Sequence, residues 1–182
     1  AKRFYWDGIA STFNFSTPIT VGACNALGTT QNQLIGVYGS QGAVYKGNPQ
    51  EELDKVFAKV PKLVRGKYVE VYPGAIAEHE GRALIGYAGV TDDSTGVELG
   101  VYEHGSEDSK LPKVLNLSYV ISTAETQATN LKIGMVKVLG KDIYIGWRSG
   151  SNYGLDKITL GDNAAASGSW ESLIFDNGDP AS

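Results

Sequence analysis

The stretch KIGMVKVLGKDIYIGWR (132–148) decides the fold class of this chain. Valine, isoleucine and aromatic residues, which favour strands, lie on both sides of the short segment LGKD (139–142), which has the residues of a turn. The stretch therefore predicts two antiparallel strands joined by a tight turn. Each expected strand also carries a glycine after an isoleucine, Gly134 and Gly146, although glycine weakens a strand by about 0.5–1 kcal/mol relative to alanine.

The same pair, a branched aliphatic residue followed by glycine, occurs in two earlier parts of the chain. Gly22 is followed by Gly36 and Gly86 by Gly100, each 14 residues later, and 12 residues separate the glycines of the third pair. Turn-forming segments lie between the members of each pair, so we expect three antiparallel hairpins. Further strands are expected after the hairpins, at 42–47, 113–122 and 154–160, with outer strands at 67–74 and 170–178 and a related fragment at 3–8.

One segment, NPQEELDKVFAKVPK (48–62), has the pattern of a helix instead of a strand. Asn48 can cap the helix, Pro49 suits the first helical position, and Glu51 completes a capping box. Pro61 ends the pattern. The spacing predicts a short helix near 49–60, and this insertion accounts for the longer step between the first and second hairpins.

A period of about 40–50 residues with four short strands per repeat is typical of a β-propeller blade. We therefore predict an all-β fold, a β-propeller-like array of antiparallel sheets with about three repeat units. The chain is expected to be a single β-repeat domain over 1–182, complete or a piece of a longer chain, with the helical insertion at 48–62 and units near 15–47, 67–122 and 123–179. In such an array, glycines leave room for bulky side chains of the neighbouring unit. A β-sandwich with glycines at bulges is the alternative.

Composition excludes several classes of protein. The formal net charge of −4 argues against a nucleic-acid binder, which needs a concentrated cationic surface. No apolar run approaches the roughly 18–20 residues of a membrane span. The single cysteine, Cys24, excludes an intramolecular disulfide framework and a cysteine-rich zinc site, and we expect it to be a small buried residue.

No catalytic or metal-binding pattern is present. His79 and His104 are the two histidines, and we expect both in exposed polar turns. Carboxylates lie near them, Glu78 and Glu80 for His79 and Glu103, Glu107 and Asp108 for His104, but neither segment has the spacing of metal ligands. The chain has no nucleophile elbow and no phosphate-binding loop. We therefore expect no catalytic residues, no metal and no cofactor, and a protein that is not an enzyme.

Aromatic residues supply the candidate binding residues. Trp147 is expected on a buried strand face, because side chains alternate along a strand. Tyr38, Tyr102 and Arg148 each lie two residues after a repeated glycine and are expected to share the opposite, exposed face. Together with Tyr153 they form the predicted ligand-binding surface.

The runs DIYIGWRSGSNYGLDKI (142–158) and SWESLIFDNGD (169–179) resemble the blade and outer-strand pattern of propeller-like domains in structural, especially tail-associated, proteins of tailed bacteriophages. The resemblance covers about the last 50 residues; the earlier units share only the glycine spacing. It implies a virion location and a non-enzymatic role in tail structure or host attachment. The implied partners are other virion proteins, copies of the same chain, or a cell-surface glycan.

Two alternatives involve carbohydrate. The first is a lectin-like, carbohydrate-binding propeller that uses the aromatic and arginine side chains named above. The second is a propeller glycoside hydrolase of the sialidase type, whose repeated turn is Ser-x-Asp-x-Gly-x-x-Trp. The nearest segments, SQGAVY (40–45) and SNYGLD (151–156), lack its aspartate and spacing, and the four arginines form no evident cluster. The hydrolase is therefore the weaker alternative.

Overall fold

The computed structural model of the protein describes residues 2–18, 22–31, 33–47, 68–90, 99–106, 110, 113–121 and 131–159. Over these residues the chain forms thirteen β-strands, all paired antiparallel, and no helix. The predicted all-β class is confirmed. The helix expected near 49–60, with its insertion 48–62, lies outside the described residues. Within the described part, no helix is long and apolar enough to cross a membrane.

Three sheets make up the body of the molecule, and each is built from strands that follow one another in the chain. The first sheet contains β3 (Cys24–Thr30), β4 (Gln33–Tyr38) and β5 (Ala43–Gly47). The second contains β6 (Tyr68–Glu70), β7 (Ile76–His79), β8 (Arg82–Val90), β9 (Gly100–Gly105) and β10 (Val114–Val120). The third contains β11 (Leu131–Leu139), β12 (Asp142–Ser149) and β13 (Asn152–Thr159). A separate hairpin joins β1 (Lys2–Tyr5) to β2 (Phe15–Pro18).

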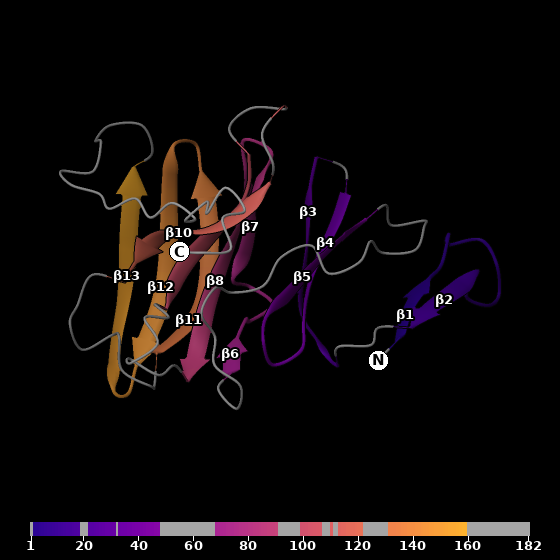
Figure 1. Ribbon diagram of the computed structural model, residues 1–182, viewed down its shortest axis with the longest axis horizontal. Coiled ribbons are helices and arrows are strands. Elements are labelled where there is room, and N and C mark those ends of the chain that lie inside the picture. The colour runs from indigo at the N-terminus through magenta and orange to yellow at the C-terminus, as the bar shows by residue number, and fades with distance from the viewer. Residues whose placement is uncertain are drawn as a thin grey trace, which may run out of the picture.

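Figure 1 shows these parts in chain order across the molecule, from the β1–β2 hairpin at the right to β13 at the left. All three predicted hairpins are confirmed, as β3–β4, β8–β9 and β11–β12. The expected third strands are β5, β10 and β13. The 67–74 segment forms β6, which pairs with the end of β8, and the fragment at 3–8 contributes to β1. The segment 170–178 lies outside the described residues.

The second sheet is sandwiched between the other two. Side chains alternate along β8, so Ile85 and Tyr87 point to one face while Gly86 points to the other. Tyr87 reaches the first sheet, where its hydroxyl donates to the carbonyl oxygen of Gly42 at 2.9 Å. On the opposite face, Gly86 meets Ile133 of β11. One continuous apolar core therefore runs through all three sheets.

Close packing at glycine joins each sheet to the next. A Cβ atom on Gly86 would lie 2.6 Å from Cγ2 of Ile133, and one on Gly28 would lie 3.0 Å from Cδ1 of Ile76. Ile76 lies in β7, which precedes the hairpin β8–β9, and Ile133 lies in β11, the first strand of the hairpin β11–β12. Gly86 thus has the role expected of the repeated glycines, because it makes room for a bulky side chain of the next unit.

The other repeated glycines have different surroundings. A Cβ atom on Gly36 would collide with the ring of Tyr38 in its own strand, and one on Gly146 would lie 3.4 Å from Cβ of Met135 in its own sheet. Gly134 lies at a β-bulge with no atom within 4 Å of where its Cβ would be. The glycines that repeat in the sequence therefore do not share one packing role in the structure.

We predict that Gly86→Ala destabilises the protein by about 1–3 kcal/mol, because a methyl group there overpacks against buried Ile133. Gly134→Ala is the matched control and should change the unfolding free energy by less than about 0.5 kcal/mol. Urea denaturation followed by tryptophan fluorescence measures both. Gly86→Ala combined with Ile133→Ala should be less destabilised than the sum of the single variants. Equal effects of the two glycine substitutions would contradict this packing.

Candidate functional site

The structure separates the four residues of the predicted binding surface. Tyr38 and Tyr102 are buried, with 2% and 3% exposure, whereas Tyr153 is 73% exposed and Arg148 is also exposed. The expected exposure of Tyr38 and Tyr102 is therefore wrong, and only Arg148 and Tyr153 remain on an exposed surface. The ring of Tyr102 packs edge-on against Tyr87 at 5.1 Å, on the face of the second sheet that the first sheet covers.

Arg148 differs from the tyrosines because its face of the third sheet is exposed, although its position in the strand is equivalent to theirs. Ile143 and Ile145 of β12 are buried in the shared core, so alternation directs Arg148 to the outer face of the third sheet. There its guanidinium carbon lies 5.5 Å from the ring centre of Tyr153, and its Nε donates to the carbonyl oxygen of Gly150 at 2.8 Å. These contacts make a stacked pair on an exposed hairpin, away from the cavity described next.

A cavity of about 420 Å³ lies between the second and third sheets, and we call it the seam pocket. One wall comes from the end of β7, from β8, β9 and β10, and from the turn between β7 and β8. The other wall comes from β12, β13 and the turn between β11 and β12. Its apolar lining consists of Leu84, Val101, Ile143 and Ile158. Leu84 and Val101 lie on the same face of the second sheet as Gly86. The pocket therefore lies beside the contact of Gly86 with Ile133, on the side toward the turns.

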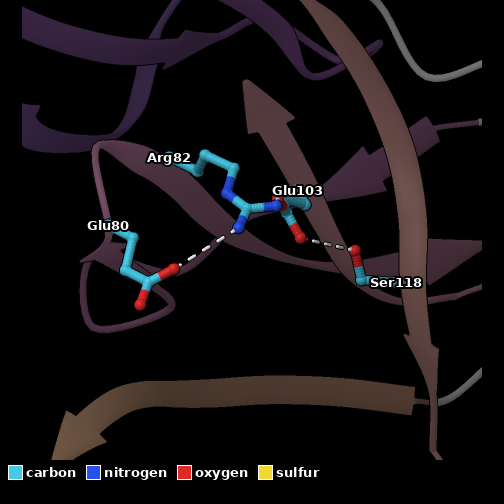
Figure 2. A network of polar contacts seen from close by, with 4 residues as sticks. All are labelled: Glu80, Arg82, Glu103 and Ser118. Carbon is cyan, nitrogen blue, oxygen red and sulfur yellow. Dashed lines mark hydrogen bonds and ion pairs between the residues drawn. The ribbon is translucent and has the colours of Figure 1, made fainter. Parts of the chain in front are cut away.

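A polar network forms one side of the seam pocket, and Figure 2 shows its four members. Arg82 Nη1 lies 2.5 Å from Glu103 Oε1, and Arg82 Nη2 lies 3.6 Å from Glu80 Oε2. Ser118 Oγ donates to the second oxygen of Glu103 at 3.2 Å. Arg82 is thus held between two carboxylates, one of which is also fixed by a hydroxyl.

A β-bulge places Ser118 in this network. Strands β9 and β10 shift register between Leu117 and Tyr119, so the neighbours Ser118 and Tyr119 both line the pocket, which regular alternation would not allow. The Tyr119 hydroxyl donates to Asp156 Oδ2 at 3.0 Å, and Trp147 Nε1 donates to Asp156 Oδ1 at 2.8 Å. Asp156 therefore ties the pocket wall of the second sheet to the third sheet.

Charges in the seam pocket are balanced. Arg82 and Lys141 are cationic, Glu80 and Glu103 are anionic, and His79 completes the polar lining. Among the described residues, no group of three or more histidine, cysteine, aspartate or glutamate side chains is arranged to hold a metal ion. The pocket combines fixed hydrogen-bond donors and acceptors with an apolar wall, which suits a polar organic ligand.

Comparison of the chain with protein-family models, curated proteins and solved structures found no match.

Sequence reasoning did not single out the seam pocket. In the sequence, Glu80 and Glu103 are distinguished only as neighbours of the histidines, and Arg82 is one of four arginines that form no evident cluster. Strand alternation could have placed Arg82 and Leu84 on one face of β8. No local signal marks the bulge that adds Ser118, because bulge position depends on pairing with β9.

A second hollow, of about 630 Å³, lies between the first and second sheets. It is lined by parts of 22–25, 39–40 and 68–72 and includes Cys24. Cys24 is exposed, which corrects its expected burial: it is the first residue of β3, at the edge of the core. Desolvation nevertheless raises the pKa of its thiol, and burial, followed by the influence of Cys24, raises the pKa of Tyr38 to about 12. A thiol with a raised pKa is a poor nucleophile at neutral pH.

His104 is buried, which corrects the prediction that it lies in an exposed turn. It belongs to β9, opposite Ala83 of β8, on the face that carries Tyr102 toward the first sheet. Burial, together with the positive charges of Lys46 and Lys113, lowers the pKa of His104 to about 4. The imidazole is therefore neutral at physiological pH and does not belong to the seam pocket.

We predict that His104 makes the protein less stable as the pH falls from about 6.5 to about 4. In this range the unfolded chain binds a proton that the folded imidazole does not accept, so up to about 3 kcal/mol of stability present above pH 6.5 is lost. Denaturant unfolding at a series of pH values should show a shallower pH dependence for His104→Leu.

NMR titration of the His104 ring protons is the direct check. A midpoint near 4 is expected, and Lys46→Met should raise it, since a cation that opposes protonation is removed. A wild-type midpoint near 6.5 would contradict the assigned burial.

Proposed function

We propose that this chain is a non-enzymatic structural or host-attachment component of a tailed-phage virion, and that its three sheets are successive units of a propeller-like array. The observation that carries the proposal is the packing of an isoleucine of each following sheet on a glycine of the preceding sheet, Ile76 on Gly28 and Ile133 on Gly86. Packing repeated in this way between antiparallel units is how propeller blades are joined. The resemblance of 142–158, which spans β12 and most of β13, to tail-associated domains supports the virion assignment.

The attachment role is supported by the seam pocket. It lies where two units meet, and its Arg82–Glu103 pair is only partly exposed, at 28% and 24% of the side-chain surfaces. Ion pairs and a hydrogen bond from the Ser118 hydroxyl hold these polar groups in fixed positions. Such groups are suited to ligand binding, because their side chains lose little conformational entropy when a ligand binds. A tail protein with such a pocket would recognise a polar group on the host surface.

A carbohydrate-binding module is the second candidate, and the lining of the seam pocket favours it. Carboxylate, guanidinium and hydroxyl groups stand beside an apolar wall, a combination that suits sugar rings. A glycoside hydrolase is the third. Hydrolysis requires two carboxyl groups with different roles across the bond, whereas Glu80 and Glu103 both approach the single guanidinium of Arg82. We therefore assign these glutamates to binding.

The virion assignment predicts that peptides of this chain are present at constant copy number in phage particles purified by density gradient. Quantitative mass spectrometry relative to the major capsid protein measures the ratio, and a host ribosomal protein serves as the contamination control. Recovery only in the host-cell fraction would contradict the assignment.

Deletion of the coding region separates the two virion roles. Particles that assemble but do not adsorb to cells indicate attachment, and particles that fail to assemble indicate a structural role. Excess purified domain should compete with particles for adsorption only in the first case.

A further inference from the structure

We infer that the seam pocket binds a neutral saccharide and discriminates against an acidic one. The inference rests on the proposed attachment role, because it names the ligand class of that site. The charge, the hydrogen-bonding capacity and the apolar wall of the pocket support it.

The charges around Arg82 decide between neutral and acidic sugars. The guanidinium of Arg82 faces two carboxylates, Glu103 at 2.5 Å and Glu80 at 3.6 Å. A ligand carboxylate could pair with Arg82 only by displacing one glutamate or by lying beside it, and like charges placed together in a partly desolvated site are unfavourable. An arginine already matched in this way does not select an anion, and the other cation of the lining, Lys141, is exposed, so that solvent and salt screen its attraction for a ligand carboxylate.

Hydrogen-bonding capacity remains after the network is formed. An ionised carboxylate has about four acceptor positions, and Glu103 uses two of them for Arg82 and Ser118. The hydroxyl of Ser118 donates to Glu103 and can still accept. Adjacent hydroxyl groups of a sugar, each both donor and acceptor, can therefore bind the carboxylate, the guanidinium and the serine without breaking the existing contacts.

The apolar wall suits the other side of a sugar ring. Leu84, Val101, Ile143 and Ile158 line the cavity; the first three are nearly completely buried and Ile158 is partly exposed. Ile158 can therefore contact the C–H face of a pyranose, while the polar network meets its hydroxyl edge. The volume of about 420 Å³ is within the range of small-molecule sites.

A matched pair of sugars tests the inference. Isothermal titration calorimetry of the 182-residue chain would use methyl glycosides of glucose, galactose, mannose and N-acetylglucosamine, and also methyl glucuronide and methyl galacturonide, which carry a carboxylate at C6. At least one neutral glycoside should bind with Kd of about 0.1–10 mM. If the glucoside or the galactoside binds, the corresponding uronic acid should bind at least about tenfold more weakly than that neutral sugar. Binding of the acids alone, or of no neutral sugar, would overturn the inference.

Glu103→Gln is the decisive variant, with Asp142→Asn as its matched control. Like Glu103, Asp142 contacts one cation and one hydroxyl group, Lys157 Nζ at 2.8 Å and Thr159 Oγ1 at 2.8 Å. Unlike Glu103, it does not line the seam pocket. Glu103→Gln should weaken binding of the neutral sugar at least about tenfold. It should also raise relative affinity for a uronic acid, because Arg82 then faces one carboxylate fewer.

Asp142→Asn should leave both affinities unchanged within about twofold. Equal losses in the two variants would overturn the assignment of the seam pocket. If Glu103→Gln does not fold, as judged by circular dichroism, Ser118→Ala replaces it and should lower the affinity for the neutral sugar about three- to tenfold. An unchanged affinity in Ser118→Ala would then count against the inference.

The sugar-binding and virion experiments together distinguish a failure of this inference from a failure of the proposed function. A chain that is present in virions but binds no neutral sugar refutes the ligand class alone. A chain that binds such a sugar but is absent from virions refutes the virion assignment and leaves a carbohydrate-binding module.

Discussion

The contact of Ile133 with Gly86 is the interaction on which the arrangement of the second and third sheets depends. A sheet with an apolar face must bury that face against another layer, and the distance between two layers is set by their bulkiest contacts. Glycine on one side lets a complete isoleucine side chain fit on the other. Ile76 on Gly28 joins the first two sheets in the same way. These contacts unite three small antiparallel sheets, each of which would be marginal alone, around one core.

The seam pocket is a consequence of this packing. On one face of β8, Gly86 makes the tight contact, and Leu84 and Arg82 follow toward the turn. Side chains fill the space at the glycine, whereas near the turns a cavity remains between the sheets. A partly exposed ion pair contributes little to stability when its desolvation is counted, so the Arg82–Glu103 pair is weak evidence for a role in folding.

Much of the local structure was predictable, and the candidate site was not. The hairpin β11–β12 follows from its β-branched residues and the turn at 139–142, and β5, β10 and β13 follow from the same pattern. The burial of His104 and Tyr102 was missed because both faces of the second sheet are covered. A strand that alternates polar and apolar residues is normally read as having one solvent face.

The sequence by itself determined the strand class, the turns and the antiparallel connection of neighbouring strands, because side-chain alternation and turn chemistry act over a few residues. Only the tertiary structure decided which glycine receives an isoleucine, which faces are covered and where Arg82, Glu103 and Ser118 meet. These outcomes depend on contacts between β8, β10 and β11, segments far apart in the chain, and on a bulge whose position is set by the pairing of two strands. A residue's place in the repeat therefore did not determine its role: Tyr102 became buried, while Arg148, at the equivalent position, remained exposed.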